Sequence, residues 1–147
     1  MLPVHMDEGE LTETELTAIH RVELGLEWLH RAHGALVAFH HKTGHAMDHL
    51  ATAEELFRES GHDELADRLR DEMLPRGVVP REDGGPGRWT YELLEAFEED
   101  LYADARTFEA AARRAVTDGR RHAAERRQQT EWRRRAAGVD GPGSTDP

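Results

Sequence analysis

Apolar residues recur every three or four positions along the first third of the chain, which is the spacing of one face of an α-helix. These positions are Leu16, Ile19, Val22, Leu26, Leu29, Leu36, Val37 and Met47. The pattern meets no proline before Pro75, and Gly61 is its first clear stop signal. We therefore expect a long helix over about residues 12–60, with a kink or a break near residues 43–44, where Gly44 weakens it.

The start of this helix carries two local signals. Thr12 and Glu15 have the spacing of a capping box, in which each side chain accepts a hydrogen bond from the backbone N–H of the other residue. Leu11 and Leu16 have the spacing of a hydrophobic staple, which fixes the direction in which the chain enters the helix. Both signals predict that the helix begins at about Thr12.

Two more helices and a loop are predicted in the rest of the chain. Residues 63–74 have the pattern of a short amphipathic helix capped by Asp63, and residues 75–89 are rich enough in proline and glycine to form a loop. A second long helix is expected over about residues 91–137, with Thr90 as its cap. Its apolar and small face consists of Leu94, Phe97, Leu101, Ala105, Phe108, Ala112, Ala115, Gly119, His122 and Arg126.

These elements predict an all-α fold with a single helical domain over residues 11–137 and flexible tails at residues 1–10 and 138–147. The two long helices would form an antiparallel hairpin, capped at one end by the short helix. Charge favours this pairing, because it brings five acidic residues within residues 7–15 close to nine arginines within residues 113–135. Two helices alone bury little surface, so a homodimeric four-helix bundle is the natural completion.

Composition narrows the classes of protein to consider. Thirty acidic residues against nineteen basic ones give a net charge of −11, which disfavours a general nucleic-acid binder. The absence of cysteine excludes disulfides and thiolate chemistry. The sequence shows neither an apolar run long enough to cross a membrane nor a signal-peptide pattern. We therefore expect a soluble, cytoplasmic protein.

The stretch LGLEWLHRAHG, followed by FHHKTGHAMDH, stands in a chain that has many carboxylates and one lysine. In this respect the sequence is similar to small acidic helical proteins of haloarchaea. The similarity covers mainly residues 22–75. It implies a halophilic helical protein and brings no activity with it.

Six of the ten histidines fall within residues 30–49. Projection at 100° per residue divides the histidines of the first helix into three groups. These are His33 and His40 near the middle of the apolar face, His30 and His41 at its edge, and His20, His45 and His49 toward the polar side. A straight helix therefore cannot direct all of them to one site.

The edge group suggests a metal site. Glu27 and His30 have the Glu-x-x-His spacing that di-iron carboxylate bundles use, Glu23 lies one turn earlier, and the predicted hairpin places His122 opposite Glu27. It also places Glu109 opposite His40 and His41. The candidate ligands are Glu23, Glu27, His30, His33, His40, His41, Glu109 and His122, and the metal would be iron or zinc. Such a bundle could be redox-active.

Other features of the sequence favour a structural role for the histidines, in which they hold helices together and bind no metal. The second Glu-x-x-His pair, Glu59 and His62, is interrupted by Gly61, and the sequence contains neither a hemerythrin-like pattern nor a His-Glu-x-x-His motif. The histidines could instead donate to facing carboxylates in a helix-packing seam, or make the packing sensitive to pH.

Three functional hypotheses follow, and an enzyme is the less favoured class, because no complete catalytic constellation is present. The first is a non-enzymatic protein that associates with itself, as a homodimer, and with a protein partner. The alternative is the metal-binding helical bundle. A weaker third hypothesis assigns the arginine-rich segment, Arg113 to Arg135, to a polyanion such as nucleic acid, with Trp132 stacking on a base.

Overall fold

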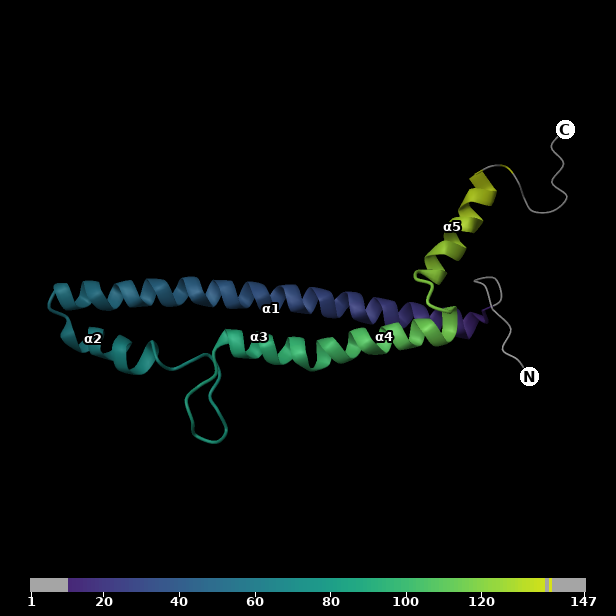
Figure 1. Cartoon of the computed structure of the whole chain (residues 1–147). Helices are drawn as coiled ribbons and strands as arrows, with labels where there is room; N and C mark the ends of the chain where they lie inside the picture. The colour runs from purple at the N-terminus through teal and green to yellow at the C-terminus, as the bar shows by residue number, and fades with distance from the viewer. Residues whose placement is uncertain (1–10, 137, 139–147) are drawn as a thin grey trace. The chain divides into compact units, whose positions relative to one another are not determined.

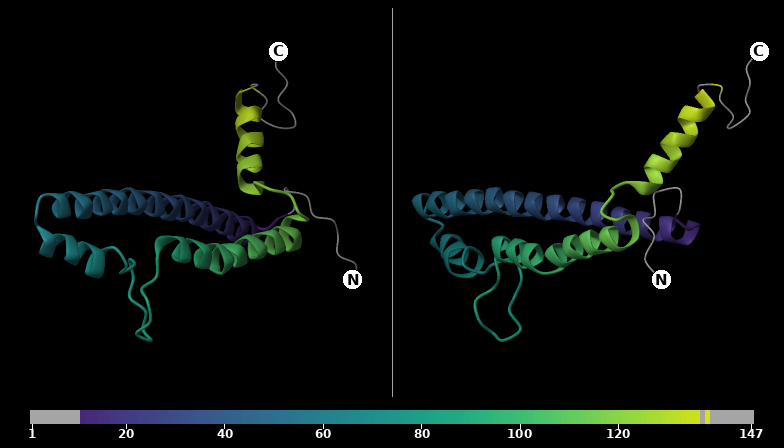
Figure 2. Two further views of the ribbon diagram at one scale, coloured as in Figure 1. Left: turned by 60° about the vertical axis from the view of Figure 1, so that its left-hand side comes forward. Right: turned by 45° about the vertical axis from the view of Figure 1, so that its right-hand side comes forward.

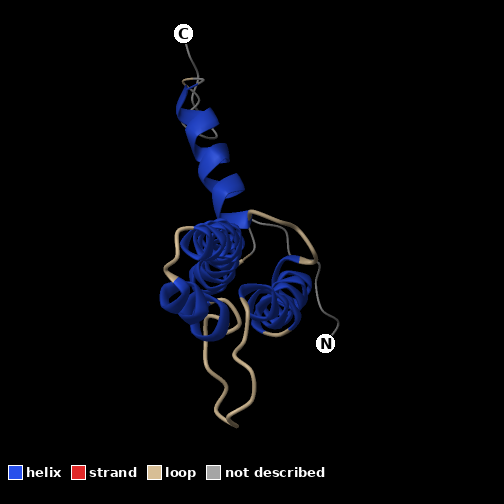
Figure 3. Cartoon of the chain, turned by 90° about the vertical axis from the view of Figure 1, so that its left-hand side faces the viewer, coloured by secondary structure: helices blue, strands red, loops and turns tan. Residues whose placement is uncertain are grey.

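The computed structural model describes residues 11–136 and residue 138, and the described chain is built from helices joined by loops (Figures 1 and 3). The elements are α1 (Glu13–Glu59), α2 (Asp63–Arg68), the π-helical segment η2 (Leu69–Met73), α3 (Thr90–Glu99), α4 (Leu101–Thr117) and α5 (Ala123–Ala136). These residues contain no strand, only an isolated antiparallel bridge between Val79 and Arg88. The predicted all-α class is confirmed. The tail predicted at residues 1–10 lies outside the described residues, and so does the tail predicted at residues 138–147 except for Gly138.

The described chain divides into two compact units. One is Leu29–Ala103, and the other contains the residues up to Trp28 together with those from Asp104 onward. We refer to them as the central unit and the terminal unit. α1 and α4 each contribute residues to both units, so each helix has two sets of neighbours.

The predicted start of α1 is confirmed in the terminal unit. The backbone N–H of Thr12 donates to Glu15 Oε1 at 3.1 Å, and the N–H of Glu15 donates to Thr12 Oγ1 at 3.0 Å. Leu11 and Leu16 are both buried and form a small core with Ala123, the first residue of α5. The staple that fixes the entry into α1 therefore also supplies the surface on which α5 begins.

The rest of α1 follows the predicted apolar face, since all eight predicted positions are buried or half-buried. The helix passes through residues 43–44 as one element, so the predicted break there is wrong. A glycine inside a helix costs only about 1 kcal/mol relative to alanine, which the neighbouring helical hydrogen bonds can offset. As predicted, α1 ends just before Gly61, which has a left-handed φ of 84°.

The central unit contains the predicted loop between η2 and α3, which leaves the helices and returns to them (Figure 2). The backbones of its two arms approach closely at Gly77 and Gly87. A Cβ at Gly77, where φ is 78°, would lie 2.8 Å from the carbonyl carbon of Gly87, so only glycine fits there. The short helix predicted just before the loop consists of α2 followed by η2, and His62 rather than Asp63 occupies its N-cap position.

The prediction of one continuous helix over residues 91–137 is wrong. The chain leaves helical geometry at Asp100 (φ −109°, ψ −102°) and again between α4 and α5, where Asp118, Gly119 and His122 have positive φ. At the second break the N–H of Gly119 donates to the carbonyl of Arg113, six residues earlier, at 3.0 Å, so the regular bonding between residues four apart ends there. The apolar face predicted for residues 91–137 is therefore divided among three helices. Two of its large side chains, Leu101 and Phe108, are 56% and 61% exposed.

Candidate functional site

Three histidines of α1 join α3 and α4 inside the central unit. His40 Nδ1 lies 2.7 Å from Thr90 Oγ1, His33 Nε2 lies 3.0 Å from Glu98 Oε2, and His30 Nδ1 lies 2.5 Å from Tyr102 Oη. As residue numbers fall along α1 they rise along its partners, so the segments run antiparallel within this unit. These three histidines therefore form hydrogen bonds between α1 and the helices α3 and α4.

The rings of the same residues are also packed against one another. His33 stacks on Tyr102 with ring centroids 4.8 Å apart, and Phe97 stacks on Tyr102 at 5.6 Å. His33 and Tyr102 therefore each contribute apolar contact through the face of the ring and a polar atom at its edge, while Phe97 contributes apolar contact alone. This geometry favours the packing role of His30, His33 and His40 over the role of metal ligands.

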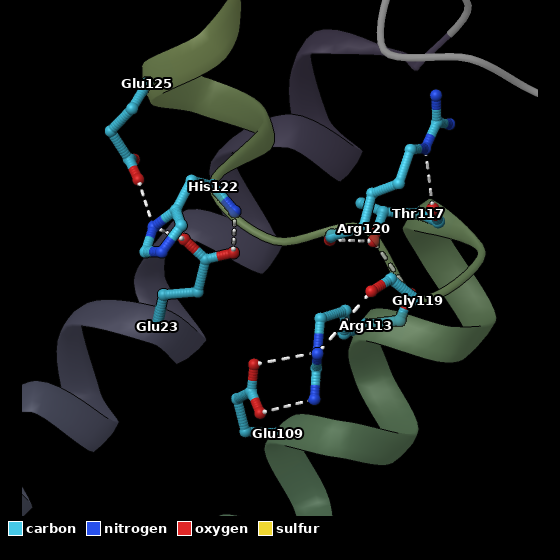
Figure 4. A network of polar contacts seen from close by, with 8 residues as sticks. All are labelled: Glu23, Glu109, Arg113, Thr117, Gly119, Arg120, His122 and Glu125. Carbon is cyan, nitrogen blue, oxygen red and sulfur yellow. Dashed lines mark hydrogen bonds and ion pairs between the residues drawn. The ribbon is translucent and has the colours of Figure 1, made fainter.

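The predicted register of Glu109 is wrong. His40 faces Thr90, while the buried carboxylate of Glu109 pairs with Arg113, one turn later on α4, at 3.2 Å (Figure 4). The expected neighbour His41 is exposed, and its ring lies 5.7 Å from that of His40. The pairs His40–Thr90, His33–Glu98 and His30–Tyr102 keep nearly the same register across the break at Asp100. The prediction fails because it assumed one helix up to residue 137, whereas α4 ends at Thr117.

A second group of histidines and carboxylates lies in the terminal unit, where α1 meets the start of α5 (Figure 4). The backbone N–H of His122 donates to Glu23 Oε1 at 3.2 Å. His122 Nδ1 lies 2.9 Å from Glu125 Oε2 and 4.0 Å from Glu23 Oε2, and His20 Nδ1 lies 2.9 Å from Glu125 Oε1. We call these four residues, His20, Glu23, His122 and Glu125, the terminal cluster.

Local structure explains how the cluster assembles. His20 and Glu23 are three residues apart on α1 and so share a face, while His122 and Glu125 have the same spacing at the start of α5. His122 adopts a left-handed φ of 59°, which turns the chain into α5. Its neighbour Ala123 is fully buried, so the first turn of α5 can approach α1 closely.

Burial changes the chemistry of Glu23, whose side chain is only 11% exposed. Desolvation raises the pKa of its carboxyl above the ordinary value, and the hydrogen bond from the N–H of His122 offsets part of this effect. The nearby carboxylate of Glu125 raises the pKa of Glu23 further, while the two histidines lower it. A buried carboxylate of this kind is stabilised by any added positive charge.

His20 Nδ1 is close to Glu125 without making a hydrogen bond to it. The nitrogen is buried, and its 2.9 Å contact with Glu125 Oε1 has the distance of an ion pair but lacks hydrogen-bond geometry. The nitrogen is thus a buried polar atom whose bonding capacity is unused among the described residues.

The structure includes two of the predicted ligands in the terminal cluster, Glu23 and His122, and adds two that the sequence analysis did not select, His20 and Glu125. His122 contacts Glu23 rather than Glu27, one helical turn earlier than predicted, and Glu27 is exposed. A signal for the cluster is present in the sequence, because His20 and His122 are each followed by glutamate three residues later.

The arginine-rich segment pairs in part with carboxylates of its own unit. Arg127 Nη2 lies 2.6 Å from Glu13 Oε1, Arg134 pairs with Glu131, and Arg113 pairs with Glu109. These contacts favour intramolecular pairing over an external polyanion as the role of these side chains.

The chain matches no protein-family model, no curated protein and no solved structure. Among the described residues, no helix combines the length and the apolar character needed to cross a membrane.

Proposed function

We propose that this protein acts by association, and that two copies pair through α1 into a helical bundle. In this proposal each copy contributes a long antiparallel hairpin, and the homodimer is the working form. The role is non-enzymatic, and the histidines of the central unit serve to hold its helices in register. A protein partner would bind the assembled dimer.

The observation that carries the proposal is a second apolar face on α1. Ala32, Ala35, Phe39 and Ala46 follow one another in steps of three, four and seven residues, which is the spacing of a coiled-coil seam. All four are exposed, and Phe39 is 43% exposed. By helical projection they lie away from the face that His33 and His40 direct toward α3.

The composition of this face suits a second copy of the same helix. Alanine lets two helices approach closely, and one large side chain, Phe39, can fill the space above the alanines of a partner. A two-fold dimer presents the same face twice, so one set of residues provides both sides of the contact. Trp28, one turn before Ala32 and 66% exposed, would extend the contact.

The small number of buried side chains also supports a partner. Among the described residues, five apolar side chains are buried, and α1 with its 47 residues contributes only Leu16 and Ile19 to them. Helices gain most of their stability by packing an apolar face. The large apolar side chains that remain exposed are Trp28, Phe39, Leu56, Leu65, Met73, Val79, Tyr91, Leu101, Phe108 and Trp132.

Size-exclusion chromatography with light scattering tests the proposal directly. At micromolar concentration we expect twice the 16.7 kDa mass of the chain. Phe39→Glu and Ala35→Glu place a charge in the seam and should each give the single-chain mass. His45→Glu adds the same charge at an exposed position outside the seam and should leave the dimer intact.

Circular dichroism accompanies each variant, so that loss of the dimer is distinguished from loss of the helices. A wild-type protein that has the single-chain mass at these concentrations would contradict the proposal. A dimer that survives both seam substitutions would contradict the assignment of the interface to α1.

A further inference from the structure

The terminal cluster has a property that the association proposal does not use. Four side chains with nitrogen and oxygen donors come from two segments about one hundred positions apart in the chain, and three of them, His20, Glu23 and Glu125, have ligand atoms within 4.8 Å of one another. We propose that His20, Glu23, His122 and Glu125 bind one divalent transition-metal ion, with zinc as the best fit. The site is independent of the dimer.

The distances suit such an ion. In a tetrahedral zinc site the bonds to nitrogen and oxygen are about 2.0–2.2 Å, which places neighbouring ligand atoms about 3.3 Å apart. His122 Nδ1 lies 2.9 Å from Glu125 Oε2 and 4.0 Å from Glu23 Oε2, and His20 Nδ1 lies 2.9 Å from Glu125 Oε1. In the proposed site the four side chains rotate so that their donor atoms reach tetrahedral spacing.

The polar atoms of the cluster are incompletely satisfied by one another. His20 Nδ1 is buried and has no hydrogen-bond partner, although a carboxylate oxygen lies beside it. A divalent cation beside these two atoms would attract both the imidazole nitrogen and the carboxylate oxygen. The same cation would compensate the buried charge of Glu23.

The donor set selects the class of metal. Two imidazole nitrogens with two carboxylates are typical of zinc and of other first-row transition metals, whereas calcium and magnesium prefer ligands that are all oxygen. Two carboxylates also balance the charge of one divalent ion. Neither Glu27 nor His30 belongs to this set, so the site differs from the Glu-x-x-His arrangement expected from the sequence.

The backbone around the cluster is already organised. His122 uses its N–H to hold Glu23, so one residue presents both a backbone donor to the carboxylate and a ring nitrogen to the ion. Arg127 fixes the next turn of α5 to α1 through Glu13 at 2.6 Å. Because these contacts exist without the ion, binding costs little ordering of the chain.

The test uses the full chain purified without a histidine tag, freed of metal with a chelator, and titrated calorimetrically with zinc. We expect one zinc ion per chain. Cobalt(II) in place of zinc should give the strong visible absorption of a tetrahedral complex, which reports coordination rather than adsorption.

His20→Ala and Glu125→Gln should each weaken zinc binding by at least tenfold and reduce the cobalt absorption. The matched control is His45→Ala, which removes a histidine spaced four residues from both His41 and His49 on the exposed side of α1. This control should bind zinc as the wild type does, and circular dichroism should show unchanged helix content in all three variants.

Three results would overturn the proposal. One is the absence of stoichiometric zinc binding to the wild-type chain. Another is zinc binding that is lost in His45→Ala but kept in His20→Ala, which would place the ion on the exposed histidines of α1. The last is binding that is unaffected by either substitution in the terminal cluster.

Discussion

At the scale of single residues, Glu23 affects the stability of the folded protein in two opposite ways. Its burial opposes the ionised carboxylate, while its hydrogen bond from the N–H of His122 holds α5 on α1. Glutamine keeps the carbonyl oxygen that accepts this hydrogen bond and removes the charge. In metal-free protein we therefore expect Glu23→Gln to raise the free energy of unfolding at neutral pH, because the variant does not bury an ionised carboxylate.

The sign of the pH dependence follows from the raised pKa. The native state binds more protons than the unfolded state at pH values just above 4.5, so the stability of the wild type falls as pH rises through the raised pKa. Glu23→Gln does not lose stability in this way. The difference in free energy of unfolding between the variant and the wild type should therefore grow as pH rises above 4.5 and vanish below it. Urea denaturation in chelator at several pH values measures it. An advantage that is the same at all pH values would mean that the charge of Glu23 is not its cause.

Residue-scale predictions from the sequence succeed where the interaction is local. The capping box of Thr12 and Glu15 and the staple of Leu11 and Leu16 depend only on spacing within one turn, so both could be predicted. The terminal cluster depends on which residue of α1 faces His122. That register is set by a left-handed turn whose backbone angles are not evident from the hydrophobic pattern.

Two glycines give a matched test at the scale of helices and turns. Added Cβ atoms at Gly34 and Gly119 would both meet open space, with nothing within 4 Å. Gly34 lies inside α1, whereas Gly119 lies between α4 and α5 with φ of 86°. The two alanine substitutions therefore differ in backbone conformation rather than in packing.

We expect opposite effects from these substitutions. Gly34→Ala should raise the free energy of unfolding by about 0.5–1 kcal/mol, because alanine restricts the unfolded chain and favours helix. Gly119→Ala should lower it by about 1 kcal/mol or more, because a left-handed φ strains any residue with a Cβ. Chemical denaturation monitored by circular dichroism measures both. Stabilisation by Gly119→Ala would show that the break between α4 and α5 is not present in solution.

Helices were predictable from the sequence where one apolar face runs without interruption. The eight predicted positions of α1 are all buried or half-buried, and the continuity of this face outweighed the weakening effect of Gly44. The second long helix was predicted too long, because alternating three- and four-residue steps continue across Asp118 and Gly119. An Asp-Gly pair is itself a turn signal. Here the turn chemistry prevailed over the periodicity.

At the scale of the whole molecule, the all-α class could be predicted because both long segments have helical periodicity and the three prolines between them lie in the loop at residues 75–89. That a second copy covers the second apolar face of α1 could not be predicted from the sequence. Its alanines, such as Ala32 and Ala35, are neutral in a helical pattern, and only their exposure in the folded chain shows that the face lies open. The homodimer therefore stays a prediction.

Salt distinguishes an apolar dimer from one held by charge. Each chain carries a net charge of −11, so pairing two copies brings like charges together and should be opposed at low ionic strength. Raising the salt from 0.01 M to 1 M shortens the screening length from about 30 Å to about 3 Å, which removes most of this repulsion. It also strengthens burial of apolar side chains when the salt is a sulfate.

We therefore expect the dissociation constant of the dimer to fall as sodium chloride is raised, and to fall further in sodium sulfate at equal ionic strength. Sedimentation equilibrium measures it, and Phe39→Glu should remain single at every salt concentration, because the seam substitution removes the apolar contact rather than the charge balance. If salt instead separates the copies, ion pairs hold them together. Arginines of α5, such as Arg133, would then pair with acidic residues of the second copy, and the interface would move from α1 to α5.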